Sequence, residues 1–461
     1  MLAAGPPSAA AGEWEAERTL ADNSSFYAIA ASGEVVHVFW GANPLRYARS
    51  TDEGGTFGAD VPLVESGEMH PTGPAVARGS NVYVVFFRYV RQATDWCCPR
   101  DLGDLYLVRS TDGGVTWEPE QRLTSAGSAF RYDLAVSGSS VHLVWSDYRG
   151  DRWQIYYRRS TDDGAEWLPE VELVPNVNDA VEVNRPQVAS EGDDVHVTWG
   201  DSRDGNPPCY TMPACSEVYY KRSTDGGADW EDDVRITFDG ADASFRPAIA
   251  TAGTDAVVIS FQSNRDGTEA AEQEIVRSDD NGTTWASPVR LTVSAGSSEH
   301  DNLVGAGSSV HLCWSEDSVD GTTHRVQYRE SLDEGATWND KEAVSGAIGG
   351  EWSVIADLAT TSGYLHAFWP DEGSMKYSRR PLGTAAPGDA GPDVDAGDNA
   401  AGDGGLDGGD PGSGCGCRAA APWSGAFSGV LVLLALWLVW FGRRRARESG
   451  GDRGRSRGFL R

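Results

Sequence analysis

The sequence predicts an all-β protein whose body is a β-propeller, a ring of four-stranded antiparallel sheets called blades. Three observations predict this fold. A Ser-x-Asp-x-Gly phrase recurs six times within 461 residues, at steps of 50 to 63 residues, and self-similarity of that period is typical of repeat architectures. Short apolar segments alternate with Gly-rich turns, as in strands joined by tight turns. No helical hydrophobic period is visible before residue 420.

Two strands are expected before each phrase. The third strand of a unit directly precedes the phrase, as in LYLVRS and IYYRRS, and a seventh copy, MKYSRR at 375–380, has no phrase after it. The second strand is apolar and ends in an aromatic residue. Its seven copies are VHVFW from Val36, VYVVF from Val82, VHLVW from Val141, VHVTW from Val195, VVISF from Val257, VHLCW from Val310 and LHAFW from Leu365.

A first and a fourth strand complete each unit. The first, as in YAIAASG and DLAVSGS, ends in a Gly turn, and the fourth carries an apolar residue six places after the aromatic of the phrase. The seventh unit has no fourth strand after it, but Trp14 and Leu20 in WEAERTL have the same spacing. We expect this N-terminal strand to complete the last blade, which would close the ring and remove exposed sheet edges. The prediction is seven blades over 12–383, with six blades as the alternative.

The phrase itself is interpreted as a turn between the third and fourth strands. Asp accepts hydrogen bonds from turn amides, Gly allows positive φ, and the aromatic residue packs on the sheet. On these repeats the chain resembles the sialidase-like Asp-box (BNR repeat) β-propeller superfamily. The resemblance implies a structural role for the six aspartates, which are Asp52, Asp112, Asp162, Asp225, Asp280 and Asp333.

Five histidines occupy one repeated place, the second residue of the second strand. A residue repeated in different blades indicates a scaffold role and not a metal cluster, so no metal or cofactor is expected. The five are His37, His142, His196, His311 and His366.

Residues just before the first strand should converge at the mouth of the central channel, opposite the phrases. FRYDLA, NRPQVA and FRPAIA place Arg131, Arg185 and Arg246 at matching positions, and His70 and His300 lie near this position in two other units. Three guanidiniums would bind a carboxylate strongly. The resemblance implies the same, because sialidases hold a sugar carboxylate with an arginine triad. The alternative is that each arginine pairs with a neighbouring loop acid, such as Asp133 or Asp301.

Two aspartates are candidate general acids. Asp147 and Asp201 stand in WSDYRGDRW and WGDSRDGN, and the alternative is a local ion pair with Arg149 or Arg203. The chain departs from the sialidase pattern, since NSSFYAIA has no arginine where that family has one before its first blade. No paired Tyr and Glu can be identified, and sialidases usually have six blades, so whether the protein is an enzyme stays open.

The net charge limits the class of partner that is expected, and the cysteines indicate a possible disulfide and a buried thiol. The net charge is −31, and residues 1–383 carry all of it, because the segments 384–414 and 415–461 carry −7 and +7. An acidic body repels nucleic acid, so no nucleic-acid partner is expected. Cys209 and Cys215 lie in one loop and could form a disulfide, while Cys313 sits in an apolar strand and is expected to be buried.

The ends of the chain predict attachment to a membrane. Residues 384–414 form an acidic Gly/Asp/Ala/Pro linker, 424–442 are uncharged and long enough for a transmembrane helix, and 443–461 form a basic tail expected on the cytoplasmic side. Residues 1–11 are interpreted as a remnant of a signal peptide. The segment 415–423 carries Cys415 and Cys417. Together with the span and the arginines it resembles the C-terminal sorting signal of myxobacterial surface proteins (MYXO-CTERM), which implies processing by a sorting protease.

The sequence leaves two candidate functions open. The first is a propeller anchored at the cell surface that binds a glycan or a cell-surface protein on the face opposite the phrases. The second is a glycoside hydrolase of the exo-sialidase type that holds an acidic sugar with its arginines.

Overall fold

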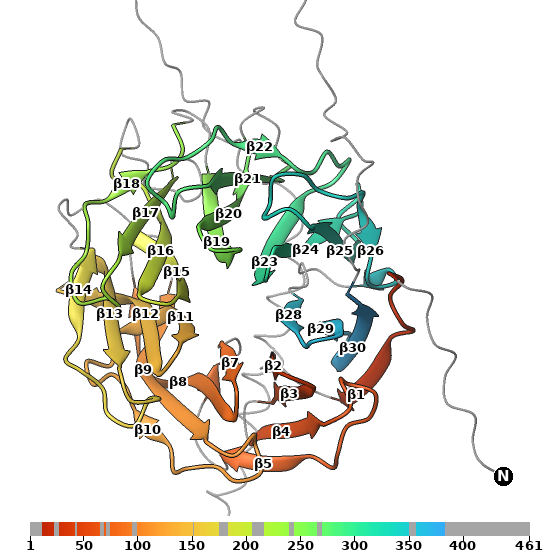
Figure 1. Cartoon of the computed structure of the whole chain (residues 1–461), viewed down its shortest axis with the longest axis horizontal. Coiled ribbons are helices and arrows are strands. Elements are labelled where there is room, and N and C mark those ends of the chain that lie inside the picture. The colour runs from red at the N-terminus through yellow and green to blue at the C-terminus, as the bar shows by residue number, and fades with distance from the viewer. Residues whose placement is uncertain are drawn as a thin grey trace, which may run out of the picture. The chain divides into compact units, whose positions relative to one another are not determined.

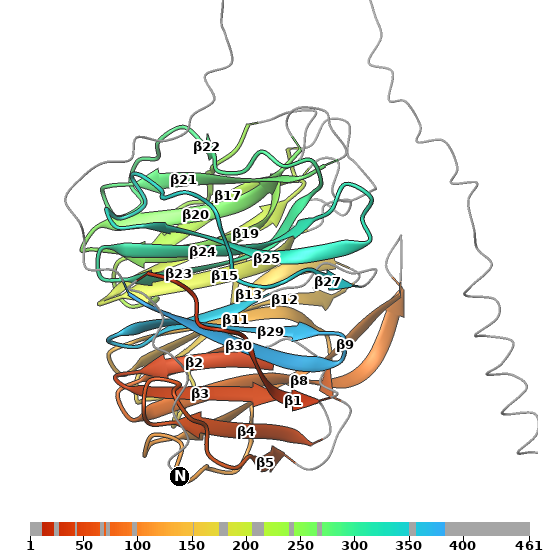
Figure 2. The ribbon, with the colours of Figure 1, turned by 90° about the vertical axis from the view of Figure 1, so that its right-hand side faces the viewer.

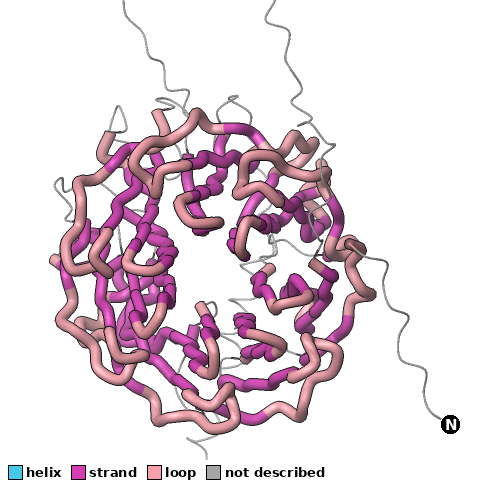
Figure 3. The backbone as a smooth tube through the Cα atoms, in the orientation of Figure 1, coloured by secondary structure: helices cyan, strands magenta, loops and turns pink. Residues whose placement is uncertain are grey.

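A computed structural model describes residues 12–22, 27–41, 44–64, 69–70, 74–94, 99–150, 152–174, 183–204, 216–238, 244–264, 270–349 and 356–382. The chain divides into two units, Met1–Val394 and Asp395–Arg461, and all described residues belong to the first. They form strands and connecting loops without a helix (Figure 3). No described helix could therefore span a membrane. The predicted linker, cysteine segment, transmembrane helix and basic tail lie outside the described residues, as do Cys415, Cys417, Cys209 and Cys215.

The described strands form antiparallel sheets whose first strands surround a central axis (Figure 1). Four sheets contain four consecutive strands, and the last of them gains β27 (Ile348–Gly349). They are β2 to β5 (Tyr27–Ser32, Val35–Trp40, Leu45–Ser50, Val61–Val64), β15 to β18 (Val183–Glu191, Asp194–Asp201, Glu217–Ser223, Val234–Arg235), β19 to β22 (Ser244–Ala252, Ala256–Ser263, Glu272–Ser278, Val289–Arg290) and β23 to β26 (Ser298–Ala306, Ser309–Asp317, Thr323–Ser331, Glu342–Ala343).

A nine-stranded sheet contains two such series. The first is β7 to β10 (Ala75–Arg78, Asn81–Thr94, Pro99–Ser110, Gln121–Arg122) with β6 (Met69–His70), and the second is β11 to β14 (Ala129–Ser137, Ser140–Arg149, Arg152–Ser160, Val171–Val174). One pair, Ala129 with Gly103, joins the two series. It can form because β8 and β9 are the longest described strands, and they extend beyond the neighbouring hairpins (Figure 2).

The remaining sheet contains both ends of the described chain. It consists of β28 (Asp357–Thr360), β29 (Tyr364–Asp371), β30 (Ser374–Pro381) and, outermost, β1 (Arg18–Asp22). Arg18 pairs with Tyr377, and the Glu15 amide donates to the Arg379 carbonyl at 2.8 Å. The N-terminal strand thus completes the last sheet, as the spacing of Trp14 and Leu20 predicted.

Neighbouring sheets pack through the aromatic residues that end the second strands. Trp145, Trp199, Trp314 and Trp369 are almost completely buried. The cluster around Trp199 joins Val144 and Tyr157 of one series to Val197 of the next. Burial of such large apolar side chains is the main favourable contribution to the stability of a repeat array.

The repeated histidines belong to these contacts between sheets. Each of the five is buried and hydrogen-bonded through Nδ1 to a third-strand tyrosine hydroxyl, at 2.7 to 2.8 Å. Burial lowers the pKa of His142 to about 4, so the ring is neutral. No described group of His, Cys, Asp or Glu residues could hold a metal.

The repeated phrase forms the same turn in each copy. In the second copy Ser110 Oγ donates to Asp112 Oδ1 at 2.8 Å, and the Thr116 amide and hydroxyl donate to Asp112. These hydrogen bonds hold the pKa of the carboxyl group well below its usual range. Gly114 has φ +77°, and a Cβ there would lie 1.9 Å from the hydroxyl of Tyr47 in the preceding sheet. The turn therefore needs glycine for its conformation and for close packing.

Candidate functional site

The three predicted arginines share an unusual backbone conformation. Arg131, Arg185 and Arg246 have φ of 30°, 56° and 53°. Each coincides with a register shift in the first strand of its sheet, between Phe130 and Tyr132, Asn184 and Gln187, and Phe245 and Ala248. Bulges of this kind redirect a side chain and are frequent near functional sites. Positive φ in a non-glycine residue is costly and persists only where surrounding structure enforces it.

These arginines line one cavity of about 370 Å³. Its walls come from the first strands, as expected for a propeller channel, and its volume is within the range of about 300 to 1,000 Å³ found for small-molecule sites. Its polar lining residues are Tyr27, Arg131, Tyr132, Asp133, Arg185, Gln187, Arg246, Asp301, Asn302 and Asp357.

Arg246 is oriented by neighbours on two strands. Its Nη1 lies 3.2 Å from Glu299 Oε2 and 3.2 Å from Gln262 Oε1. The Glu299 contact is the local pairing that the sequence left open, although the partner is Glu299 and not Asp301. Arg131 lies over the Phe130 ring, with its guanidinium carbon 5.0 Å from the ring centroid.

Three aspartates enter the same cavity from first strands. Asp133 accepts from the Val188 amide at 2.9 Å, on the next sheet. Asp357 accepts from the Ile29 and Leu358 amides at 2.9 and 3.0 Å and from Asn302 Nδ2 at 3.1 Å. Asp301 accepts from the Ser260 hydroxyl. Asp133 and Asp357 thus link first strands of neighbouring sheets, and Asp301 links its first strand to the second strand of the preceding sheet, so the orientation of all three is fixed.

Desolvation raises the pKa of these carboxyl groups, whereas hydrogen bonds lower the pKa of the aspartates in the repeated turns. Burial inside the channel raises the pKa of Asp133 and Asp301 to about 6. It raises the pKa of Asp357 to about 7, to which the nearby charge of Asp133 contributes. Arg246 and Arg185 moderate the shift at Asp301. Carboxyl groups that titrate near neutral pH inside a cavity are candidates for function.

Sequence reasoning considered Asp133 and Asp301 only as partners of arginines, and it missed Asp357. A signal was present, because Asp-Leu-Ala occurs at both 133–135 and 357–359. The two segments are equivalent in the sheets, since Asp133 pairs with Val144 and Asp357 with Phe368 at matching places of second strands.

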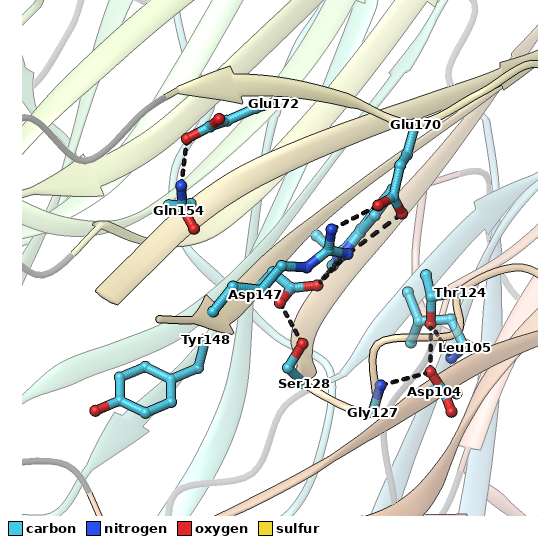
Figure 4. A network of polar contacts seen from close by, with 12 residues as sticks. Asp104, Leu105, Thr124, Gly127, Ser128, Asp147, Tyr148, Gln154, Glu170 and Glu172 are labelled. Carbon is cyan, nitrogen blue, oxygen red and sulfur yellow. Dashed lines mark hydrogen bonds and ion pairs between the residues drawn. The ribbon is translucent and has the colours of Figure 1, made fainter. Parts of the chain in front are cut away.

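The candidate acids Asp147 and Asp201 do not line the cavity. Both are completely buried. Asp147 accepts from Ser128, as Figure 4 shows, and from Trp145 Nε1 and Arg149 Nη2, both at 2.9 Å. In Figure 4, Tyr148 points away from this network.

Asp201 has an equivalent environment. It accepts from Trp199 Nε1 at 3.0 Å and from the Arg203 amide and Nε, both at 2.8 Å. The placement of Asp147 and Asp201 argues against their role as general acids and favours the local ion-pair interpretation.

The backbones of the two histidine candidates lie on described strands. His70 is on β6, and His300 is on β23 within the register shift between Glu299 and Asn302, at the position equivalent to the arginines. Their side chains lie outside the described part. Cys313 is a free, buried thiol, as predicted, and its Sγ lies 3.4 Å from the Ala356 carbonyl.

Comparison with known proteins gives similarity of fold. No protein-family model matches the chain, and no curated protein matches it. The crystal structure of a polysaccharide lyase covers 80% of this chain and 100% of its own, at 11% identity and a TM-score of 0.51. The sialidase of Trypanosoma rangeli covers 71% of this chain and 55% of its own, at 13% identity and a TM-score of 0.44.

An α-L-arabinanase of Penicillium chrysogenum covers 65% of this chain and 90% of its own, at 17% identity and a TM-score of 0.43. At these identities the similarity concerns the fold alone. Together with the sheet topology, it places the chain among all-β proteins of the β-propeller type.

Proposed function

We propose that this protein is a seven-bladed, sialidase-like Asp-box propeller that binds an acidic glycan in its central channel. One observation carries the proposal: Arg131, Arg185 and Arg246 occupy equivalent bulges on consecutive first strands and line one cavity. Guanidiniums form paired, charge-assisted hydrogen bonds to a carboxylate. The cavity lies in a body whose net charge is strongly negative, so anion binding there depends on this local positive cluster.

The proposal includes the location of the protein. The Gly/Asp linker, the uncharged span at 424–442 and the arginines after it support a body outside the cytoplasm, held at the cell surface by a MYXO-CTERM-type tail. Removal of residues 424–461 should release the protein into the medium. Retention of that truncated protein at the cell surface would contradict the proposed tail.

Binding is tested with the full chain by titration calorimetry. The probes are N-acetylneuraminate and glucuronate, with glucose as an uncharged control. We expect the double variant Arg185→Ala/Arg246→Ala to lose at least about tenfold in affinity for both acids, which corresponds to about 1.4 kcal/mol. Arg46→Ala is the matched control, because Arg46 pairs with Asp60 on the outer part of a sheet. Equal affinity in the double variant and the control would overturn the proposal.

Hydrolysis is the second candidate function. It is favoured by Asp301 and Asp357, which line the same cavity and have pKa values raised to about 6 and 7, within the range useful for general acid catalysis. Turnover of a fluorogenic sialoside that is lost in Asp301→Asn or Asp357→Asn would favour an enzyme. Binding of N-acetylneuraminate without turnover of the sialoside would favour a binding protein.

A further inference from the structure

Opposite charges are unevenly distributed around the ring inside the channel cavity. Arg131, Arg185 and Arg246 come from the consecutive strands β11, β15 and β19, which we call the arginine wall. Asp301 and Asp357 come from the next two first strands, β23 and β28, which we call the acidic wall. The third cavity aspartate, Asp133, lies on β11, a strand of the arginine wall. The first strands follow one another around the axis (Figure 1), so the two walls occupy different parts of the circumference.

Within the described part of the chain, two cavity carboxylates have no cation beside them. Among the described residues neither Asp133 nor Asp357 forms an ion pair, and their hydrogen-bond partners there are backbone amides and the Asn302 amide group. This differs from Asp147 and Asp201, each of which is paired with an arginine. Asp133 also contributes repulsion at Asp357, so a positive group bound at Asp357 would offset an unfavourable interaction.

Fixed donors leave acceptor capacity on the acidic wall. A carboxylate has about four lone-pair positions, and three donors occupy positions on Asp357. Asp301 receives the Ser260 hydroxyl. An ammonium has three donors, which is enough to bind more than one carboxylate.

An unsatisfied hydroxyl also points to a ligand. The Tyr132 hydroxyl oxygen is buried and has no hydrogen-bond partner in the described part of the chain, and Tyr132 lines the cavity between Arg131 and Asp133. Buried polar groups almost always have a partner. A polar ligand atom would supply one if the Tyr132 ring turned toward the cavity on binding.

We propose that the cavity binds a small zwitterionic ligand, with its carboxylate on the arginine wall and its ammonium on the acidic wall. The inference rests on the proposed carboxylate site and narrows its ligand class. The shared chemistry is one carboxylate and one primary amine on a molecule that fits about 370 Å³. An amino-sugar acid and a free amino acid both have this chemistry.

The test compares two probes that differ at the amine, which is charged in one and acetylated in the other. Titration calorimetry with the full chain uses muramic acid, which has a carboxylate and an ammonium, and N-acetylmuramic acid, in which acylation removes the positive charge. We expect muramic acid to bind at least about tenfold more tightly. In Asp301→Asn/Asp357→Asn this ratio should fall to about one, while binding of N-acetylmuramic acid persists, because Asn keeps the shape and an acceptor.

Each outcome separates the inference from the function on which it rests. Equal binding of the two probes to the wild-type chain overturns the zwitterion proposal and leaves the carboxylate site intact. Absence of binding by both probes and by glucuronate overturns both. The wild-type comparison needs no variant, so it holds even where the double variant does not fold. Alanine as a further probe distinguishes the sources, since binding comparable to that of muramic acid indicates an amino acid and much weaker binding indicates an amino-sugar acid.

Discussion

The repeated turns and the channel mouth are both built from residues that recur from sheet to sheet, but their carboxylates behave in opposite ways. Asp112 in a turn accepts hydrogen bonds from Ser110 and Thr116, which lower its pKa. Asp357 in the channel is desolvated, and its pKa is raised to about 7. Recurrence therefore does not separate scaffold from site. A scaffold carboxylate differs from a site carboxylate in whether hydrogen bonds or ion pairs within its own sheet stabilise its charge.

Acidification should have the largest effect on stability, and it tests the scaffold role of the five repeated histidines. Burial lowers the pKa of His37, His142, His196 and His311 to about 4 and that of His366 to about 3. An unfolded histidine titrates near 6.5. Below about pH 6.5 the unfolded state therefore binds protons that the folded state excludes, and stability falls by several kcal/mol toward about pH 4.

The channel carboxylates oppose this trend. Their raised pKa values mean that the folded state binds protons as the pH falls from about 7 toward 4, which stabilises it. Since five histidines oppose three aspartates, we expect a net loss, measured as a falling urea midpoint. Asp133→Asn should make the loss steeper. A midpoint that rises on acidification would show that the channel groups dominate.

Removal of a buried ion-pair partner is the next largest effect. Asp147→Ala leaves Arg149 without its buried partner, and Asp201→Ala does the same to Arg203. Each should lower the free energy of unfolding by about 3 to 5 kcal/mol, measured by chemical denaturation. Affinity of the folded protein for glucuronate should stay unchanged. Lost binding with unchanged stability would move these aspartates from the scaffold to the site.

Two glycines provide a matched test of the turn. A Cβ at Gly227 would lie 1.9 Å from the Tyr157 hydroxyl, whereas one at Gly192 would meet no atom within 4 Å, and both residues have positive φ. Gly192→Ala should cost about 1 kcal/mol for the left-handed backbone alone. Gly227→Ala should cost about 2 to 4 kcal/mol, because overpacking adds to that term. Equal urea midpoints for the two variants would show that the contact between Gly227 and Tyr157 rearranges at little energetic cost.

Loss of one hydroxyl should have the smallest effect, and it tests whether the Tyr132 hydroxyl contributes to the cavity site. Tyr132→Phe removes a buried hydroxyl without a described partner, so stability should stay equal or rise by about 1 kcal/mol. Affinity for muramic acid should fall by about fivefold, the equivalent of one hydrogen bond. Tyr157→Phe, which removes the partner of His142, should do the reverse and lower only stability. A stability loss in Tyr132→Phe would assign its hydroxyl to the scaffold.

Local sequence signals predicted much of the fold. The period of the phrase, the aromatic ends of the second strands and the spacing of Trp14 and Leu20 predicted the all-β repeat and the pairing of β1 with β30. The equivalent arginines were also visible, since residues at one repeat position must lie at one level of a ring. These features depend on short-range patterns, which a sequence displays directly.

Tertiary structure decided which polar residues are satisfied. The sequence showed aspartates of similar appearance at 147, 201, 301 and 357. Asp147 and Asp201 pair with arginines two residues away, an alternative visible in the sequence, whereas only the packing of the sheets places Asp357 in the channel, where it has no ion pair among the described residues. Burial and charge compensation depend on neighbours far away in the chain, such as Ile29 beside Asp357. The sequence by itself determined the repeat and the level of the arginines, and the assembled ring decided the chemistry of the cavity, because desolvation arises only when the sheets enclose it.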